Sequence, residues 1–196
     1  MLASITPLGE RGRNAHWSVT VVAFAVGATA AGAALGAALA ALGQLLVPGA
    51  GGARWRLVVL AAALVAAIAL DLGRRPVPGP HRQVNERWLD EYRGWVYGLG
   101  FGIQLGLGVT TVVSSAATYV ALLAAFLAPN VAGGAVIMGS FGAVRGLTLL
   151  AGAKIATPPQ LLALHRRLAR SRERAVWAGT GVLAAVVVAA LAAGAT

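Results

Sequence analysis

The segment GLGFGIQLGLGVTTVVSSAATY, residues 98–119, has five glycines in its first eleven positions, one glutamine and no charged residue. In a water-soluble protein, each glycine inside a helix costs about 0.5–1 kcal/mol relative to alanine. In a lipid bilayer, small residues instead let two helix backbones approach closely, because packing replaces the hydrophobic effect as the force between helices. The segment therefore indicates a helix that packs against others inside a membrane.

The composition of the whole chain supports this interpretation. Of its 196 residues, 58% are hydrophobic and 11% are charged, which is more apolar surface than a chain of this length buries in one water-soluble core. We expect an all-α, polytopic transmembrane helix bundle that forms a single domain over residues 1–196. The net charge is +10, but the basic residues lie between the apolar runs, so we do not expect nucleic acid as a partner.

Five apolar runs predict about five membrane crossings. The first run would extend roughly 40 Å as a helix, more than the ~30 Å thickness of the hydrocarbon layer. It is also longer than the apolar part of a signal peptide, so we expect it to be retained. The third run is too long for one straight helix, so we expect either a start that lies along the membrane surface or a break at its glycines, between Gly106 and Thr111. The predicted crossings are residues 20–47, 57–72, 95–128, 131–153 and 176–195.

Two segments between these runs are expected to lie along the membrane surface. The polar loop of residues 73–94 closes with the aromatic and charged stretch NERWLDEYRGW. The stretch TPPQLLALHRRLARSRERAV, residues 157–176, alternates leucines with arginines, a pattern typical of interfacial amphipathic helices.

The distribution of basic residues predicts the orientation. With five crossings, thirteen of the sixteen lysines and arginines fall on the side of the N-terminal tail and two fall on the other side. The positive-inside rule then places the N-terminus in the cytoplasm and the C-terminus outside. An alanine-, glycine- and arginine-rich composition suggests a bacterial cytoplasmic membrane, with anionic lipid head groups as partners of the basic loops.

The glycines allow two interpretations of the third run. Gly98, Gly102 and Gly106 lie four residues apart on one helix face, which favours close packing against another helix. Three further glycines of the fourth run, Gly139, Gly142 and Gly146, give room for the same kind of contact. Alternatively, the break is a solute site, because broken helices line the substrate sites of many carriers. The candidate substrate path then contains Gln104, Thr110, Thr111, Ser114 and Arg145.

Arg145 lies well inside the fourth run. An arginine at the centre of a membrane helix costs at least about 2.5 kcal/mol on insertion scales, so it should face a partner, water or the interface. Its side chain either extends toward the interface as a structural tie or contacts an anion or substrate. Few counter-charges are available: Asp71 and Glu10 lie near helix boundaries, and Gln104 offers a carbonyl oxygen instead.

Several kinds of chemistry are not expected. The chain has no cysteine, which excludes disulfides, thiolate metal sites and thiol redox chemistry. Its three histidines, His16, His81 and His165, lie far apart in tails and loops, so we predict no metal site. No catalytic set or phosphate-binding motif is evident, and we expect neither an enzyme nor a cofactor.

One family resemblance rests on residues 95–126, WVYGLGFGIQLGLGVTTVVSSAATYVALLAAF, and on the following stretch GGAVIMGSFGAVRGLTLLAG. These resemble the second half of the cytochrome c biogenesis and DsbD-type transmembrane electron carriers, in the LysE-like transporter grouping. The opening SITPLGERGR, with Pro7, is similar to the end of the matching helix in the first repeat. The resemblance implies a small-residue bundle with a helix broken near Val109 to Thr111.

This chain departs from that family in two ways. The family carries electrons through a pair of membrane cysteines, and here those positions offer hydroxyls but no thiol, so the redox activity does not transfer. Most of the family's first helix is also missing, so the chain is either a shortened descendant or one whose partner supplies the missing wall. Two functions remain: a small carrier of a solute or ion, or a non-catalytic membrane subunit that packs on partner helices, as a homo-oligomer or with another protein.

Overall fold

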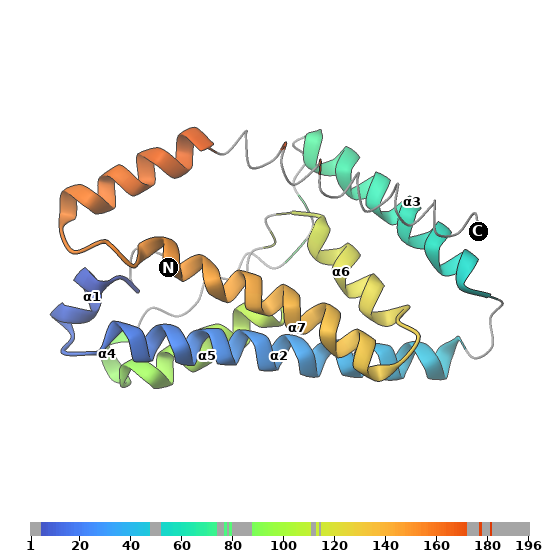
Figure 1. Cartoon of the computed structure of the whole chain (residues 1–196), viewed down its shortest axis with the longest axis horizontal. Helices are drawn as coiled ribbons and strands as arrows, with labels where there is room; N and C mark the ends of the chain where they lie inside the picture. Colours follow the sequence, from blue (N-terminus) through green and yellow to red (C-terminus); the bar gives the residue numbers. More distant parts are fainter. Residues whose placement is uncertain are drawn as a thin grey trace.

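The computed structural model describes residues 5–47, 52–73, 77, 79, 88–110, 113, 115–171, 177 and 181. All regular structure in these residues is helical (Figure 1). The elements are α1 (Pro7–Gly12), α2 (Trp17–Leu46), α3 (Gly52–Leu72), α4 (Trp88–Glu91), α5 (Gly94–Gly106), α6 (Ala117–Phe126), α7 (Val131–Leu147) and the 3₁₀ helix η1 (Thr148–Gly152). A further helix covers residues 158–171.

Three of the described helical segments are long and apolar enough to cross a membrane. They are Trp17–Leu46, Arg54–Leu72 and Val131–Gly152. These segments agree with the first, second and fourth apolar runs of the sequence, and they support a membrane protein. The fifth predicted crossing, residues 176–195, lies outside the described residues apart from Trp177 and Gly181, so the count of five stays a prediction.

The third apolar run forms two short helices instead of one. Helix α5 has 13 residues and α6 has 10, so at about 1.5 Å per residue each is too short to cross a ~30 Å hydrocarbon layer alone. Helix α5 ends at Gly106, and Gly108 follows with φ +75°, a left-handed conformation that favours glycine. The expected break of the third run is therefore present.

Helix α2 is the centre of the bundle, and α5 packs along it in the same direction. A Cβ atom added to Gly98 would lie 2.6 Å from the carbonyl oxygen of Thr20. Gly102 and Gly106 meet the carbonyls of the next two residues on that face, Phe24 and Ala28. Each of these contacts is too close for any side chain. Glycines four residues apart on α5 therefore let its backbone touch the backbone of α2.

Helix α7 packs on α2 in the opposite direction. Gly134 of α7 faces Gly36 of α2, whereas Gly142, two turns later, faces Ala28. The helix begins at Asn130, whose side-chain oxygen accepts a hydrogen bond of 2.7 Å from the backbone nitrogen of Gly133, a standard N-terminal cap. Helices α2, α5 and α7 thus form a tight unit with glycine at the contacts.

Helix α3 stands apart from this unit in Figure 1 and meets the bundle through α6. Its outward side chains are exposed, among them Val58 at 60% and Val65 at 57%. The helix of residues 158–171 follows η1 and carries exposed Leu162 and Leu168 among exposed arginines. This composition fits the interfacial helix expected there.

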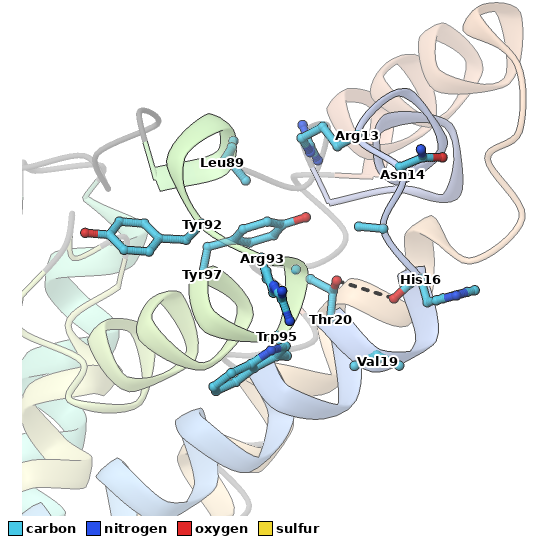
Figure 2. Close-up of a pocket in the computed structure, with 12 residues that line it drawn as sticks. Arg13, Asn14, His16, Val19, Thr20, Leu89, Tyr92, Arg93, Trp95 and Tyr97 are labelled. Carbon is cyan, nitrogen blue, oxygen red and sulfur yellow. Dashed lines mark hydrogen bonds between the residues drawn. The ribbon is translucent and has the colours of Figure 1, made fainter.

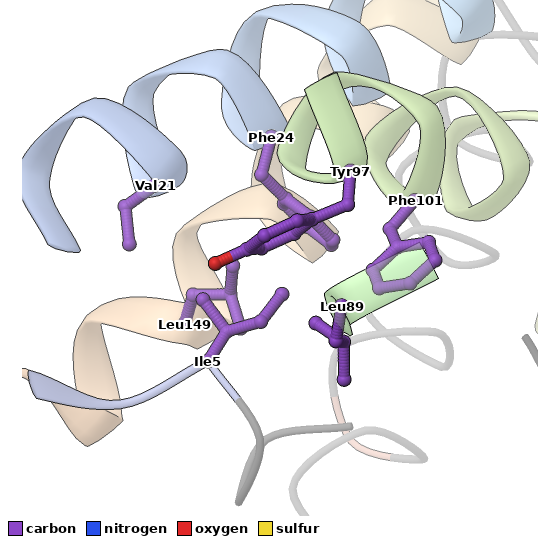
Figure 3. Packing of buried hydrophobic residues seen from close by; sticks show 7 residues of the cluster. All are labelled: Ile5, Val21, Phe24, Leu89, Tyr97, Phe101 and Leu149. Carbon is purple, nitrogen blue, oxygen red and sulfur yellow. The ribbon is translucent and has the colours of Figure 1, made fainter. Parts of the chain in front are cut away.

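A hydrophobic cluster closes one end of the bundle, where Ile5, just before α1, meets α2, α4, α5 and the start of η1 (Figure 3). Tyr97 lies at its centre. Trp88 of α4 stacks on Phe101 with 6.0 Å between the ring centroids. The buried members are Ile5, Val21, Phe24, Leu89, Tyr97, Phe101 and Leu149. This cluster ties the chain's first turn to the helices that follow.

Candidate functional site

The break between α5 and α6 is held by hydrogen bonds from both sides. Before it, the hydroxyl of Thr110 donates to the backbone carbonyl oxygen of Gln104, which satisfies one of the carbonyls left free at the end of a helix. After it, the carboxylate of Asp71 accepts from the hydroxyl of Ser115 at 2.7 Å and from the backbone nitrogen of Ala116 at 2.9 Å. Asp71 therefore binds the start of α6.

Arg145 of α7 lies beside this break. Its Nη1 atom would be 3.8 Å from a Cβ atom added to Gly108, and its guanidinium lies 5.2 Å from the centre of the Phe141 ring. The Nη1 atom is buried and has no hydrogen-bond acceptor in the described part of the chain. The side chain thus brings an unsatisfied positive charge to the point where the third run is interrupted.

The structure brings together only part of the predicted substrate path. Thr110 is bonded to the backbone of Gln104, and Arg145 lies next to Gly108 at the same break. Thr111 and Ser114 lie outside the described residues. The two expected counter-charges for Arg145 are engaged elsewhere, since Asp71 binds the start of α6 and Glu10 forms an ion pair with Arg13.

All six glycines predicted to pack lie against α2, which is part of the same chain. Gly139 faces Ala33, and Gly146 faces Ala25. The alternative hypothesis assigned these faces to the helices of a partner. In the structure, α2 of the same chain packs against these faces. It can do so because α2 has small residues every four positions along the contact, namely Ala28, Gly32, Gly36 and Ala40. This complementary row was the signal in the sequence.

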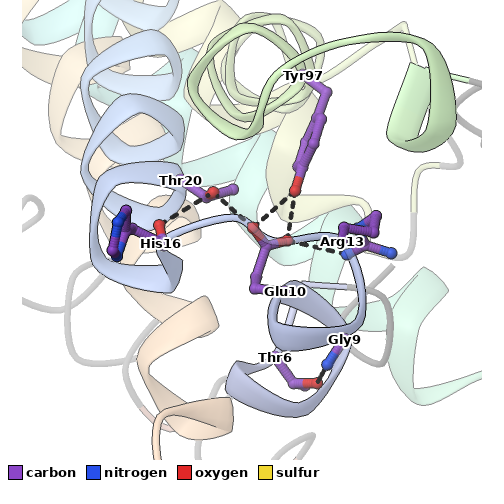
Figure 4. Close-up of polar contacts among 7 residues, drawn as sticks. All are labelled: Thr6, Gly9, Glu10, Arg13, His16, Thr20 and Tyr97. Atoms are coloured by element: carbon purple, nitrogen blue, oxygen red, sulfur yellow. Dashed lines mark hydrogen bonds and ion pairs between the residues drawn. The ribbon is translucent and has the colours of Figure 1, made fainter.

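A buried polar cluster at the end of the bundle was not predicted (Figure 4). Glu10 is fully buried, and its carboxylate accepts hydrogen bonds from the hydroxyl of Tyr97 at 2.6 and 2.7 Å and from that of Thr20 at 2.8 Å. Arg13 completes the cluster with an ion pair of 2.9 Å. The carboxylate therefore joins α1, the start of α2 and the start of α5.

The electrostatics of Arg13 follow from this cluster. Burial alone would lower the pKa of its guanidinium, but the hydrogen bonds and charges of Glu10 and Tyr97 outweigh burial and raise that pKa. Arg13 therefore stays charged at any pH at which a membrane protein is handled. The sequence carries one sign of this arrangement, because Thr6 followed by Pro7 is a helix-start pattern and Thr6 accepts a hydrogen bond from Gly9 at 3.2 Å.

A cleft of about 510 Å³ opens beside the buried cluster (Figure 2). One wall comes from the α1–α2 turn, with Asn14 and His16, and the other from the start of α5, with Arg93 and Trp95. The described residues contain no group of three histidines, cysteines or acids that could hold a metal ion. The polar side chains that line the cleft are basic, hydroxyl-bearing and, at Asn14, an amide.

Comparisons with protein-family models, with curated proteins and with solved structures find no match for this chain.

Proposed function

We propose that this protein is a small integral membrane carrier that moves a small anionic solute past the break between α5 and α6. The single observation behind the proposal is the guanidinium of Arg145. Its Nη1 atom is buried without an acceptor in the described part of the chain, and it lies beside Gly108, where the third run is interrupted.

The energetics favour an anion-binding role for Arg145 over a purely structural role. A charged arginine inside a membrane helix costs at least about 2.5 kcal/mol. The contact with the Phe141 ring returns about 0.5–2 kcal/mol, and no acid among the described residues pairs with Arg145. A transient anion at the guanidinium would offset the remaining cost each time it passes.

The surroundings of the break support the same reading. Interrupted helices place polar backbone groups near the middle of a bundle, which carriers use to coordinate solutes. The start of α6 is already occupied by the carboxylate of Asp71, so an anion would find its free positive charge at Arg145.

Anion flux into proteoliposomes tests the proposal. The purified chain would be reconstituted and assayed for uptake of labelled acetate, phosphate and sulfate. We expect uptake of at least one anion, a loss of tenfold or more in Arg145→Met, and partial retention in Arg145→Lys. The matched control Arg167→Gln removes one exposed charge of the helix at residues 158–171 and should leave flux unchanged. No uptake of any anion, or full uptake by Arg145→Met, would contradict the proposal.

A membrane subunit is the second candidate, and one observation favours it. Helix α3 meets the bundle through α6 and exposes Val58 and Val65 outward, so its outer face is free for a neighbouring helix. If a second copy of this chain packs on that face, a single cysteine introduced at either position should give disulfide-linked dimers in the membrane. Monomer alone after oxidation, for both variants, would remove this candidate.

A further inference from the structure

We propose that the cleft between the α1–α2 turn and the start of α5 binds a phosphate-bearing anionic head group, and that its source is a membrane glycerophospholipid. This inference goes beyond the proposed carrier function and does not depend on it. Four observations support it: the cavity itself, an arginine in its wall with no partner among the described residues, two helices that begin at it, and an apolar stripe that leads away from it.

The charge of the cleft is positive. Arg13 and Arg93 both line it, and the charge of Arg13 is balanced by its ion pair with Glu10. The side chain of Arg93 makes no ion pair or hydrogen bond to any residue that the structure describes. One full positive charge is therefore available to a ligand, with His16 beside it.

Two helices that run in the same direction begin at this cavity. The caps of α2 and α5 are His16 and Arg93, and neither side chain bonds to the first turn of its helix. The first free backbone N–H groups of these helices have no acceptor within the described residues, whereas the carbonyls of both caps are bonded to later residues. Uncapped N-termini attract anions through these N–H groups and through the helix dipole.

The cleft also lies where a lipid would present its phosphate. It is at the end of the candidate membrane span Trp17–Leu46, and its rim includes Tyr92 and Trp95, which are 49% and 52% exposed. Half-exposed aromatic residues of this kind are typical of the boundary between lipid and water.

An apolar stripe on α2 distinguishes a lipid from a free anion. Val19 lines the cleft and is 50% exposed, and Val22 and Val26 continue the same face with exposures of 62% and 56%. Residues three and four apart share a helix face, so the stripe leads from the head-group cleft along the span. An acyl chain would lie on it while the phosphate contacts Arg93.

Ligand titration of the full-length chain in detergent tests this inference. Dihexanoyl phosphatidylglycerol, dihexanoyl phosphatidylcholine and sodium phosphate would be added separately, with thermal unfolding as the readout. We expect phosphatidylglycerol to raise the midpoint, the zwitterionic lipid to act at least several-fold more weakly, and phosphate at equal concentration to have no effect. Phosphate as effective as phosphatidylglycerol would assign the cleft to a free anion and overturn the lipid assignment.

Two arginine variants test the location. Arg93→Gln should weaken phosphatidylglycerol binding about tenfold, the usual size of one lost charge-assisted hydrogen bond, while Arg93→Lys should keep most of it. Arg167→Gln makes the same charge change far along the chain, in the exposed helix of residues 158–171, and should stay within twofold. Equal weakening by Arg93→Gln and Arg167→Gln would show diffuse attraction by a basic surface and overturn the site.

These results separate the lipid site from the carrier proposal. Arg93 lies in the cleft, whereas Arg145 lies at the break. We therefore expect Arg93→Gln to lose lipid binding, and its anion flux is measured in a separate assay. A chain that carries anions but binds no phosphatidylglycerol overturns the inference made here alone.

Discussion

The hydroxyl of Tyr97 is expected to stabilise the whole end of the bundle, and Tyr97→Phe tests this. The ring would keep its place in the hydrophobic cluster, so the substitution removes only the hydrogen bond to Glu10. That hydroxyl lies 2.6 and 2.7 Å from the two carboxylate oxygens, and its single proton is shared between them. The change therefore removes one charge-assisted bond, not two.

The expected loss follows from that count. A hydrogen bond to a charged group contributes about 1.5–3 kcal/mol, and Glu10 is fully buried, so no water replaces the lost donor at once. We expect Tyr97→Phe to lower the free energy of unfolding by about 1.5–3 kcal/mol. Thermal or denaturant unfolding in detergent micelles, followed by circular dichroism, measures it.

Tyr92→Phe is the matched control. It removes the same atom from a tyrosine that is 49% exposed and packs edge-on against Trp88 at 5.8 Å between ring centroids. Its cost should stay within about 0.5 kcal/mol, as for most exposed positions. Equal stability of the two variants would refute the reasoning, because the buried carboxylate would then gain nothing from its tyrosine.

Three further predictions concern packing, the break and the topology. Gly102→Leu should prevent α5 from packing on α2, because an added Cβ already overlaps the carbonyl of Phe24. Gly12→Leu is the control, because a Cβ at that position meets nothing within 4 Å. The yield of folded protein in detergent should fall for the first variant only. Asp71→Ala should cost about 1–3 kcal/mol, because the backbone nitrogen of Ala116 and a neighbouring hydroxyl lose their acceptor, and an unfolding midpoint equal to that of the native chain would contradict it. A reporter fused to the C-terminus should be active outside the cytoplasm, since the charge distribution with five crossings predicts it; a cytoplasmic reporter would contradict the predicted combination of five crossings and a cytoplasmic N-terminus.

The parts of the fold that follow from local physics could be predicted. The apolar runs mark three of the helices, and the length of the third run together with its glycines indicates a break near Gly106. The row of Gly98, Gly102 and Gly106 also indicates close helix packing, because small residues at this spacing have one common use in lipid. The helix at residues 158–171 follows from its leucine and arginine pattern.

The remaining features depend on contacts between distant parts of the chain. Nothing local to Glu10 indicates that it is buried, because its partner Tyr97 lies 87 residues away. Asp71 looks like a helix-end acid, and only the fold places it 44 residues from Ser115 at the start of α6. The glycine spacing of α5 likewise does not indicate which helix packs against it, and only the structure identifies that helix as α2.

The resemblance to the DsbD-type carriers and the carrier function both stay predictions, and they depend on the same point. A carrier of either kind needs polar groups inside the membrane, and our proposal places them at the break that follows Gly106. The absence of cysteine from the chain makes this step accessible to a simple chemical probe, because a single introduced thiol is then the only one present.

Labelling of single-cysteine variants by a water-soluble, membrane-impermeant thiol reagent in proteoliposomes is therefore the most direct test. Thr110→Cys places the thiol at the break, and Val136→Cys places it on the 69% exposed outer face of α7. We predict rapid labelling at the break and none on the lipid-facing side. Thr110→Cys as unreactive as Val136→Cys would show that no water reaches the break, and would contradict a solute path there.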